Sequence, residues 1–297
     1  MLDVFYVLQQ EHRLLLFFVV FVFGACIGSF LNVVIYRLPI MLKRQWEVEA
    51  KEYIAVSQGQ PSGACDTEVV KSQRFNLAFP ASSCPSCSAA IKPWQNIPIL
   101  SYILLRGKCA NCKSAISIRY PLVELFTGLI TLILLMRFGV SNEFLAMMAF
   151  SYVSIALTGI DIDEQLLPDV LTLPLLWVGL LINTQNTFVP LQDAVIGAAV
   201  GYLSLWAIYW LFKLVTGKEG MGYGDFKLMA VFGSWFGWNL LPNIVLLSSL
   251  VGAVLGVGLI LVGRQKSQQP LPFGPFIIIA GWLTVMFPSC FLLANYL

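Results

Sequence analysis

Four cysteines form two Cys-x-x-Cys pairs, Cys84 with Cys87 and Cys109 with Cys112, and 21 residues separate the pairs. Four thiolates from two such pairs can form a tetrahedron around one Zn²⁺. The alternatives are disulfides, unliganded thiols, or an iron–sulfur or redox site, and a reducing cytoplasm disfavours the disulfides. Because four protein ligands close a zinc site to substrate, the pattern predicts one structural zinc ion per chain.

Carboxylates at the ends of apolar segments are the second feature that could do chemistry. They form two clusters: Asp161, Asp163, Glu164 and Asp169 in the first, and Asp225, preceded by Gly222 and Gly224, in the second. Ionisable groups at membrane depth are costly and are functional by default. Two carboxylates at one water-accessible site can share a proton, so that one activates water while the other polarises a peptide carbonyl. This aspartic-protease chemistry needs neither a histidine nor a metal ion.

Structural explanations exist for the same carboxylates. Asp163 and Glu164 could simply lie in the lipid headgroup region. Asp169 could be the N-cap of a following helix, and Asp225 could cap another helix, where the helix dipole favours a negative charge. The two glycines before Asp225 favour a functional role, because they allow another chain to approach its carboxylate closely and a simple cap does not need them.

The composition restricts where these groups can lie. The chain has 297 residues, of which 58% are hydrophobic and only 11% are charged, and its mean hydropathy is +0.79. Soluble domains carry about 25% charged residues, and disordered chains are far more polar, so both classes are excluded. The composition fits a polytopic membrane protein. His12 is the only histidine, which excludes a histidine-based triad or a histidine-rich metal centre within the membrane.

Eight apolar segments are expected to span the membrane, and the fold class predicted is an all-α polytopic membrane protein. The first segment, 14–36, has 23 residues without a charge, and no small-residue cleavage site follows it, so a retained span is favoured over a signal peptide. The expected spans are 14–36, 121–138, 143–160, 170–183, 193–215, 226–238, 243–262 and 273–294.

The stretch between the first two spans is the only one long enough for an extramembrane domain. It carries 11 Lys and Arg, 5 Asp and Glu, and the four paired cysteines. We therefore expect three parts: the N-terminus with the first span (1–36), a zinc-binding domain (37–120) and a seven-span membrane domain (121–297). A cytoplasmic zinc-binding domain places 16 of the 18 basic residues in the cytoplasm, as the positive-inside rule requires, and directs both termini outward, to the periplasm of a bacterium.

Several motifs together resemble the type IV prepilin peptidase family of bacterial inner membranes, over nearly the whole chain. The matching segments are 28–39 (GSFLNVVIYRLP), Cys84 to Cys112, Asn96-Ile97-Pro98, Arg119-Tyr120-Pro121 with Glu124, 161–169, and 222–227 (GYGDFK). The resemblance implies a bifunctional leader peptidase and N-methyltransferase, in which Asp161 and Asp225 form the catalytic pair. The residues alone do not separate Asp161 from Asp163.

The resemblance also implies the partners. The substrates would be prepilins and pseudopilins, whose basic leader is removed after a glycine and whose new N-terminal residue, commonly phenylalanine, is methylated from S-adenosylmethionine. Membrane lipid is the other expected partner, and no nucleic acid is expected. No Gly-x-Gly-x-x-Gly motif follows a strand, so no residue is assigned to the methyl donor.

Two other classes of function remain open on the residues alone. An ion-coupled transporter could use Asp161 and Asp225 as relays, and a non-catalytic scaffold could be held by the zinc domain. Transporters usually show internal repeats and acidic groups near mid-span. Here the acidic groups lie at span ends and no repeat is visible, which favours the peptidase.

Overall fold

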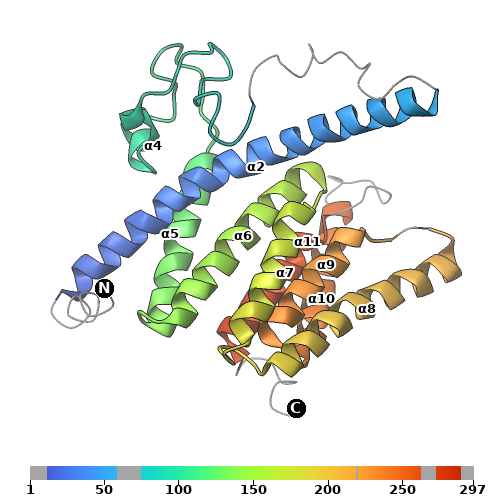
Figure 1. Cartoon of the computed structure of the whole chain (residues 1–297). Coiled ribbons are helices and arrows are strands. Elements are labelled where there is room, and N and C mark those ends of the chain that lie inside the picture. Colours follow the sequence, from blue (N-terminus) through green and yellow to red (C-terminus); the bar gives the residue numbers. More distant parts are fainter. Residues whose placement is uncertain (1–11, 59–74, 219, 262–271, 289–297) are drawn as a thin grey trace. The chain divides into compact units, whose positions relative to one another are not determined.

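A computed structural model describes residues 12–58, 75–218, 220–261 and 272–288. Within these ranges the chain is helical and contains no strand, only two isolated β-bridges in the cysteine-rich segment. The chain divides into two compact units, Met1–Met136 and Arg137–Leu297. The prediction of an all-α protein is therefore confirmed for the part that the structure describes (Figure 1).

The first unit is built on two helices that approach closely. It contains α2 (Arg13–Ser57), the 3₁₀ turn η1 (Pro93–Asn96), the short helix α4 (Leu100–Leu104) and α5 (Arg119–Phe138). A β-carbon at Gly28 of α2 would lie 2.8 Å from the Cα atom of Glu124 on α5. Small residues at such a contact allow two membrane helices to pack backbone against backbone.

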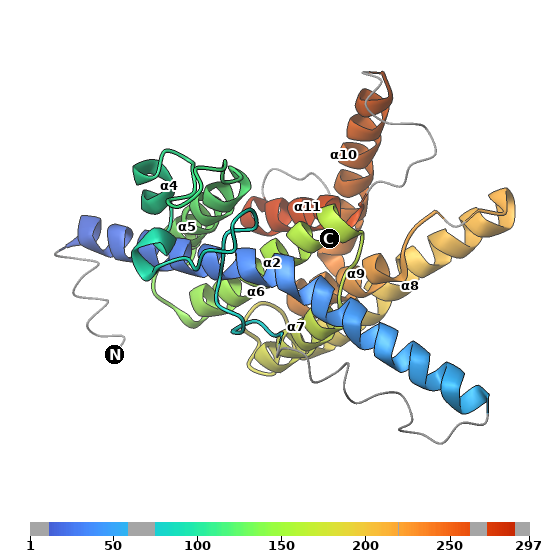
Figure 2. The same ribbon diagram turned by 90° about the horizontal axis from the view of Figure 1, so that it is seen from above.

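Helix α2 is longer than the span expected at 14–36. It continues past Tyr36, through Pro39, to Ser57 as one unbroken helix (Figure 2). Its 45 residues correspond to about 68 Å at the rise of an α-helix, more than twice the thickness of the hydrocarbon core. The change of charge after residue 36 therefore marks where the apolar segment ends, but the helix does not end there.

The second unit surrounds one buried helix. Its elements are α6 (Asn142–Glu164), α7 (Asp169–Asn183), α8 (Leu191–Thr216), α9 (Tyr223–Phe236), the 3₁₀ turn η2 (Trp238–Leu240), α10 (Leu241–Leu261) and α11 (Gly274–Met286). From Phe226 to Phe236 every residue of α9 except Lys227 is buried. Helices α7, α8 and α11 pack against α9, and Gly197 of α8 lies against Gly233 of α9. This packing fixes the N-terminal end of α9, which carries Asp225.

Each expected span corresponds to a helix, but the helices differ in length. Five are long and apolar enough to cross a membrane: Arg13–Ser57, Arg119–Phe138, Asn142–Glu164, Leu191–Thr216 and Trp238–Gly258. Three others, α7, α9 and α11, have 15, 14 and 13 residues. At about 1.5 Å per residue they are shorter than a hydrocarbon core. Part of the expected eighth span, from residue 289 onward, lies outside the described residues.

Candidate active site and cysteine cluster

The four predicted cysteines lie together in the first unit. Their Sγ atoms are all within 4.8 Å of one another, and the Sγ atoms of Cys84 and Cys112 are 3.8 Å apart. With a Zn–S bond of about 2.3 Å, the edge of a tetrahedral four-cysteine site is about 3.8 Å. All four are free thiols. The donor set and its spacing therefore fit one zinc ion with four sulfur ligands.

Two matching turns hold the cysteines. In the first, the Cys84 amide donates to the Ala89 carbonyl and the Ser88 amide donates back to Cys84. In the second, the Cys109 amide donates to the Ser114 carbonyl and the Lys113 amide donates back to Cys109. These local bonds close both turns, so each Cys-x-x-Cys pair can form without distant parts of the chain.

The turns favour the metal-binding thiolate form at two of the cysteines, Cys84 and Cys112. The backbone amides of Ser86 and Cys87 lower the pKa of the Cys84 thiol to about 6. The hydroxyl of Ser114 lowers the pKa of the Cys112 thiol as well. Desolvation and the thiols of Cys112 and Cys84 raise the pKa of the Cys87 thiol. Because thiolates rather than thiols are metal ligands, the hydrogen bonds at Cys84 and Cys112 prepare these two residues for a cation.

The two aspartates predicted to be catalytic are both buried in the second unit. Asp161, in the last turn of α6, is 5% exposed, and Asp225, in the first turn of α9, is 6% exposed. Gly224, next to Asp225, and Gly274, whose amide donates to Asp161, both lie against Leu167, although Asp225 is 64 positions after Asp161 in the chain. The fold therefore brings together the two acidic clusters that the sequence singled out.

A third element completes this site. The Gly274 amide, at the start of α11, donates a hydrogen bond of 3.0 Å to Oδ2 of Asp161. A β-carbon at Gly274 would lie 2.7 Å from that oxygen, so only a glycine allows the approach. The first amides of a helix lack partners within the helix and favour a negative charge, so α11 supplies a donor to the Asp161 carboxylate.

Leu167 fills the space between these elements. It lies in the loop between α6 and α7 and is buried. A β-carbon at Gly224 would lie 2.8 Å from its Cβ atom, and one at Gly274 would lie 3.2 Å from its Cδ2 atom. The two glycines that flank the aspartates therefore contact the same leucine, which holds the ends of α6, α9 and α11 around one point.

The N-cap interpretation is wrong for Asp169, whereas Asp225 does contribute to the cap of its helix. Pro168 is the N-cap of α7, and Asp169 is the first helical residue. Gly222 is the N-cap of α9, and Asp225 is the third residue, whose carboxylate accepts a hydrogen bond from the Gly222 amide. This bond satisfies one free amide of the helix end, yet it leaves the second carboxylate oxygen for other partners.

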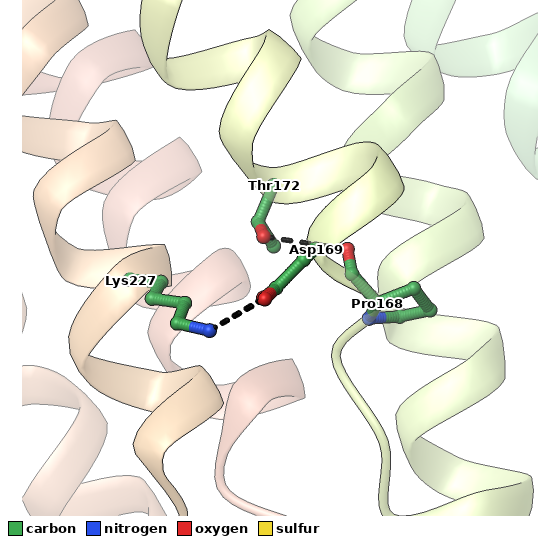
Figure 3. A network of polar contacts seen from close by, with 4 residues as sticks. All are labelled: Pro168, Asp169, Thr172 and Lys227. Atoms are coloured by element: carbon green, nitrogen blue, oxygen red, sulfur yellow. Dashed lines mark hydrogen bonds and ion pairs between the residues drawn. The ribbon is translucent and has the colours of Figure 1, made fainter. Parts of the chain in front are cut away.

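Asp169 instead forms an ion pair with Lys227, two residues after Asp225. The Nζ atom of Lys227 lies 2.6 Å and 2.8 Å from the two carboxylate oxygens of Asp169 (Figure 3). Thr172, one turn further into α7, donates a hydrogen bond to the Pro168 carbonyl. The ion pair therefore joins the first turn of α7 to the first turn of α9 beside the aspartates.

The other acidic residues are not part of the buried site. Asp163 and Glu164, at the end of α6, are exposed, and Glu219 lies outside the described residues. Sequence reasoning missed Gly274 and Leu167. A signal for Gly274 exists, since it is followed by Pro275, and a proline at the first positions of a helix marks an N-terminus whose amides are free.

Comparison with known proteins identifies the relatives of the chain. Residues 22–138 match the family model for the bacterial peptidase A24 N-terminal domain, and residues 148–257 match that for the type IV leader peptidase family. The chain is 52% identical over 281 residues to the prepilin leader peptidase/N-methyltransferase of Aeromonas salmonicida (strain A449), with 94% of each chain covered. It is 52% identical over 265 residues to the protein of the same name from Pseudomonas putida, covering 89% of this chain and 88% of the relative. No solved structure matches the chain with significance.

Proposed function

Because the chain belongs to the type IV leader peptidase family, we propose that it removes the leader peptide from type IV prepilins and pseudopilins and then methylates the new N-terminus. The observation that carries the peptidase half is the pair of buried aspartates at the ends of α6 and α9, whose neighbouring glycines Gly274 and Gly224 both contact Leu167. The relatives' shared name supports both activities.

In this proposal Asp161 and Asp225 hydrolyse the peptide bond as one unit. The ionised carboxylate takes a proton from a water molecule, and the resulting hydroxide attacks the carbonyl carbon of the glycine before the scissile bond. The protonated carboxyl donates to the carbonyl oxygen as negative charge develops there. Collapse of the tetrahedral intermediate breaks the C–N bond, and the proton taken from water passes to the leaving amine. The Gly274 amide holds the Asp161 carboxylate in place through these steps.

Zinc and the methyl donor have separate roles in the proposal. Cys84, Cys87, Cys109 and Cys112 would hold one structural zinc ion, as their spacing supports. S-adenosylmethionine would supply the methyl group that the new N-terminal amine accepts. We assign no residue to the methyl donor.

The membrane arrangement is part of the same proposal. We place α7, α9 and α11 in the membrane with the five longer helices, giving eight spans, with both termini in the periplasm and the protein in the inner membrane. The proposed parts are 1–36, 37–120 and 121–297, with α2 running through the first boundary. The excess of Lys and Arg in 37–120 supports a cytoplasmic position for the cysteine cluster.

Reaction of the purified protein with a prepilin tests this function. Mass spectrometry should find the prepilin shortened by its leader, and the mature chain heavier by one methyl group only when S-adenosylmethionine is present. An intact prepilin, after incubation with protein that retains its zinc, would contradict the peptidase assignment. Proton or sodium flux in vesicles without any cleavage would favour the transporter.

A further inference from the structure

Helix α4 in the first unit presents an apolar face that no described part of that unit covers. Leu100, Ile103 and Leu104 are 57%, 62% and 72% exposed. Residues three and four apart lie on one side of a helix, so these three side chains form a continuous surface. Trp94 and Ile97, just before α4, are also exposed. A contiguous apolar surface of this kind marks an interaction site.

A buried carboxylate fixes the level of α4 along α5. The amide of Ile99, directly before α4, donates a hydrogen bond of 2.7 Å to Oε2 of Glu124. Ile99 has a positive φ of 63°, which is rare for a β-branched residue and persists only where the surroundings hold it. In both views α4 lies beside the start of α5 (Figures 1 and 2). The contact therefore determines where α4 lies along that helix.

The register of α5 in a membrane can be read from its two arginines. Arg119 is its first residue and Arg137 lies in its last turn. The rise over the 18 positions from Arg119 to Arg137 is about 27 Å, close to the thickness of a hydrocarbon core. Glu124 is five residues after Arg119, which places it about 7.5 Å along the axis toward the centre. Ile99 and the start of α4 then lie about 7.5 Å closer to the membrane centre than Arg119, within the depth of about 5–10 Å to which interfacial helices insert.

The residues around α4 suit such a position. Trp94 and Tyr120 are exposed aromatic residues with a polar group, which favour the membrane–water interface. Lys92 and Arg106 are exposed on either side of the apolar segment. Basic residues next to an apolar surface attract the phosphates of anionic lipids. The exposed basic side chains and the level of α4 in the membrane therefore both indicate anionic lipid as the partner.

We infer that α4 and the turn before it are inserted into the membrane leaflet on the side of the cysteine cluster, as an interfacial anchor that Glu124 tethers to α5. Leu100, Ile103 and Leu104 contact acyl chains, while Lys92 and Arg106 contact anionic headgroups. The anchor holds the cysteine cluster at the membrane surface. It does not depend on the peptidase or methyltransferase activity.

A spin label at Leu104 tests the insertion directly. The label is attached through a genetically encoded ketone amino acid, so that the cysteines stay intact, and the full chain is reconstituted in vesicles of phosphatidylethanolamine and phosphatidylglycerol. We expect the label to collide more with oxygen, which concentrates in lipid, than with a water-soluble nickel chelate. Lys51 is the control: it is exposed on α2, about 21 Å beyond Arg37, and should show the opposite preference.

Two results would overturn the inference. A label at Leu104 that prefers the nickel chelate, as at Lys51, would show that α4 lies in water. A label shielded from both reagents would show that protein, either the rest of the chain or a second copy, covers the apolar face.

A matched pair of variants tests the tether. Glu124→Gln keeps an oxygen that can accept from the Ile99 amide, whereas Glu124→Ala removes it. The excess of oxygen over nickel collisions at Leu104 should persist in the first variant and be lost in the second, with zinc content unchanged in both. If both variants fold and the Leu104 label lies at the same membrane depth in both, the role of Glu124 is contradicted. If Glu124→Ala does not fold, the Leu104 label in the otherwise unmodified chain alone decides whether α4 is inserted.

Discussion

The cysteine cluster and the aspartate pair are two polar sites of opposite construction. The cysteines lie on two short turns that close with their own backbone hydrogen bonds, and only Cys84 of the four is buried. The aspartates are both buried and come from the ends of two helices, with a donor from a third helix, 113 residues beyond Asp161. A cation would hold the first site together, whereas helix packing holds the second.

Because the two sites are held together differently, different changes should disrupt the cysteine cluster and the aspartate pair. Loss of one ligand should remove the metal and loosen the first unit without moving the aspartates, because each site lies within its own unit. A small change in helix packing should misplace the aspartates while the cysteines keep their metal. The two sites should therefore respond to different substitutions.

The largest effect is expected at the cysteine cluster. Structural zinc contributes about 10–16 kcal/mol of binding free energy in small zinc domains, so Cys84→Ser should lower the zinc content from about one ion per chain to near none. Proteolysis within 75–118 should become faster. Elemental analysis under reducing conditions checks the metal, and Cys26→Ser, at an exposed free thiol of α2, is the control. Full zinc content in the Cys84 variant would exclude the four-cysteine site.

Apart from the two aspartates themselves, the next largest effect is expected at Gly274. In Gly274→Ala the new β-carbon would meet Oδ2 of Asp161, so the carboxylate or α11 must move. A displacement that costs about 1.4–2.7 kcal/mol in the transition state lowers the rate about 10- to 100-fold. Prepilin cleavage measures this loss, and zinc content should stay unchanged. Gly258→Ala is the matched control, because nothing lies within 4 Å of a β-carbon there. Equal cleavage by both variants would remove Gly274 from the site.

A smaller effect is expected from the exposed carboxylates. The leaders of this family's substrates are basic, so Asp163 and Glu164 should orient them beside Asp161. Each exposed charge contributes about 1 kcal/mol or less, so Asp163→Asn with Glu164→Gln should raise KM by about tenfold with kcat kept. The effect should fade as salt rises. Glu219, six residues before Asp225 in the sequence, is a third candidate for this role, and Glu219→Gln can be added to the variant. An unchanged KM at low salt would place leader recognition elsewhere.

The smallest effect is expected at the ion pair between Asp169 and Lys227. Both side chains are partly exposed, and exposed pairs contribute about 0–1 kcal/mol. Asp169→Asn should therefore lower cleavage by about fivefold at most. Lys227→Arg, which can keep the pair, should stay closer to the unmodified protein. A loss of many powers of ten in Asp169→Asn would give this residue a direct part in the reaction.

The same contrast explains what could be predicted from the sequence. The cysteine cluster depends on two local turns, so the spacing of Cys84, Cys87, Cys109 and Cys112 was enough to predict it. The aspartates could be named from their motifs and their position at the ends of apolar segments. Gly274 could not be placed beside Asp161, because that contact depends on how α11 packs on α6 and α9.

Helix ends were predicted less well than the helices themselves. Hydropathy indicates where a segment leaves the hydrocarbon core of the membrane, and the first span was therefore predicted to end at Tyr36. The segment after Pro39 is rich in lysine, arginine, glutamate and alanine, which are good helix formers in water, so α2 continues to Ser57. A change of charge therefore marks the limit of a membrane span and not the limit of a helix.

In the proposed reaction Asp161 and Asp225 act as one catalytic pair. Prepilin cleavage by purified Asp161→Asn, Asp225→Asn and the double variant tests it most directly, with Asp163→Asn, two residues away on the same helix end, as the control. Removal of either partner takes away the base or the proton donor, so both single variants should lose cleavage by many powers of ten. The double variant should be no slower than the slower single variant, because residues that act as a unit are not additive. Cleavage at the unmodified rate by either single variant would contradict the account.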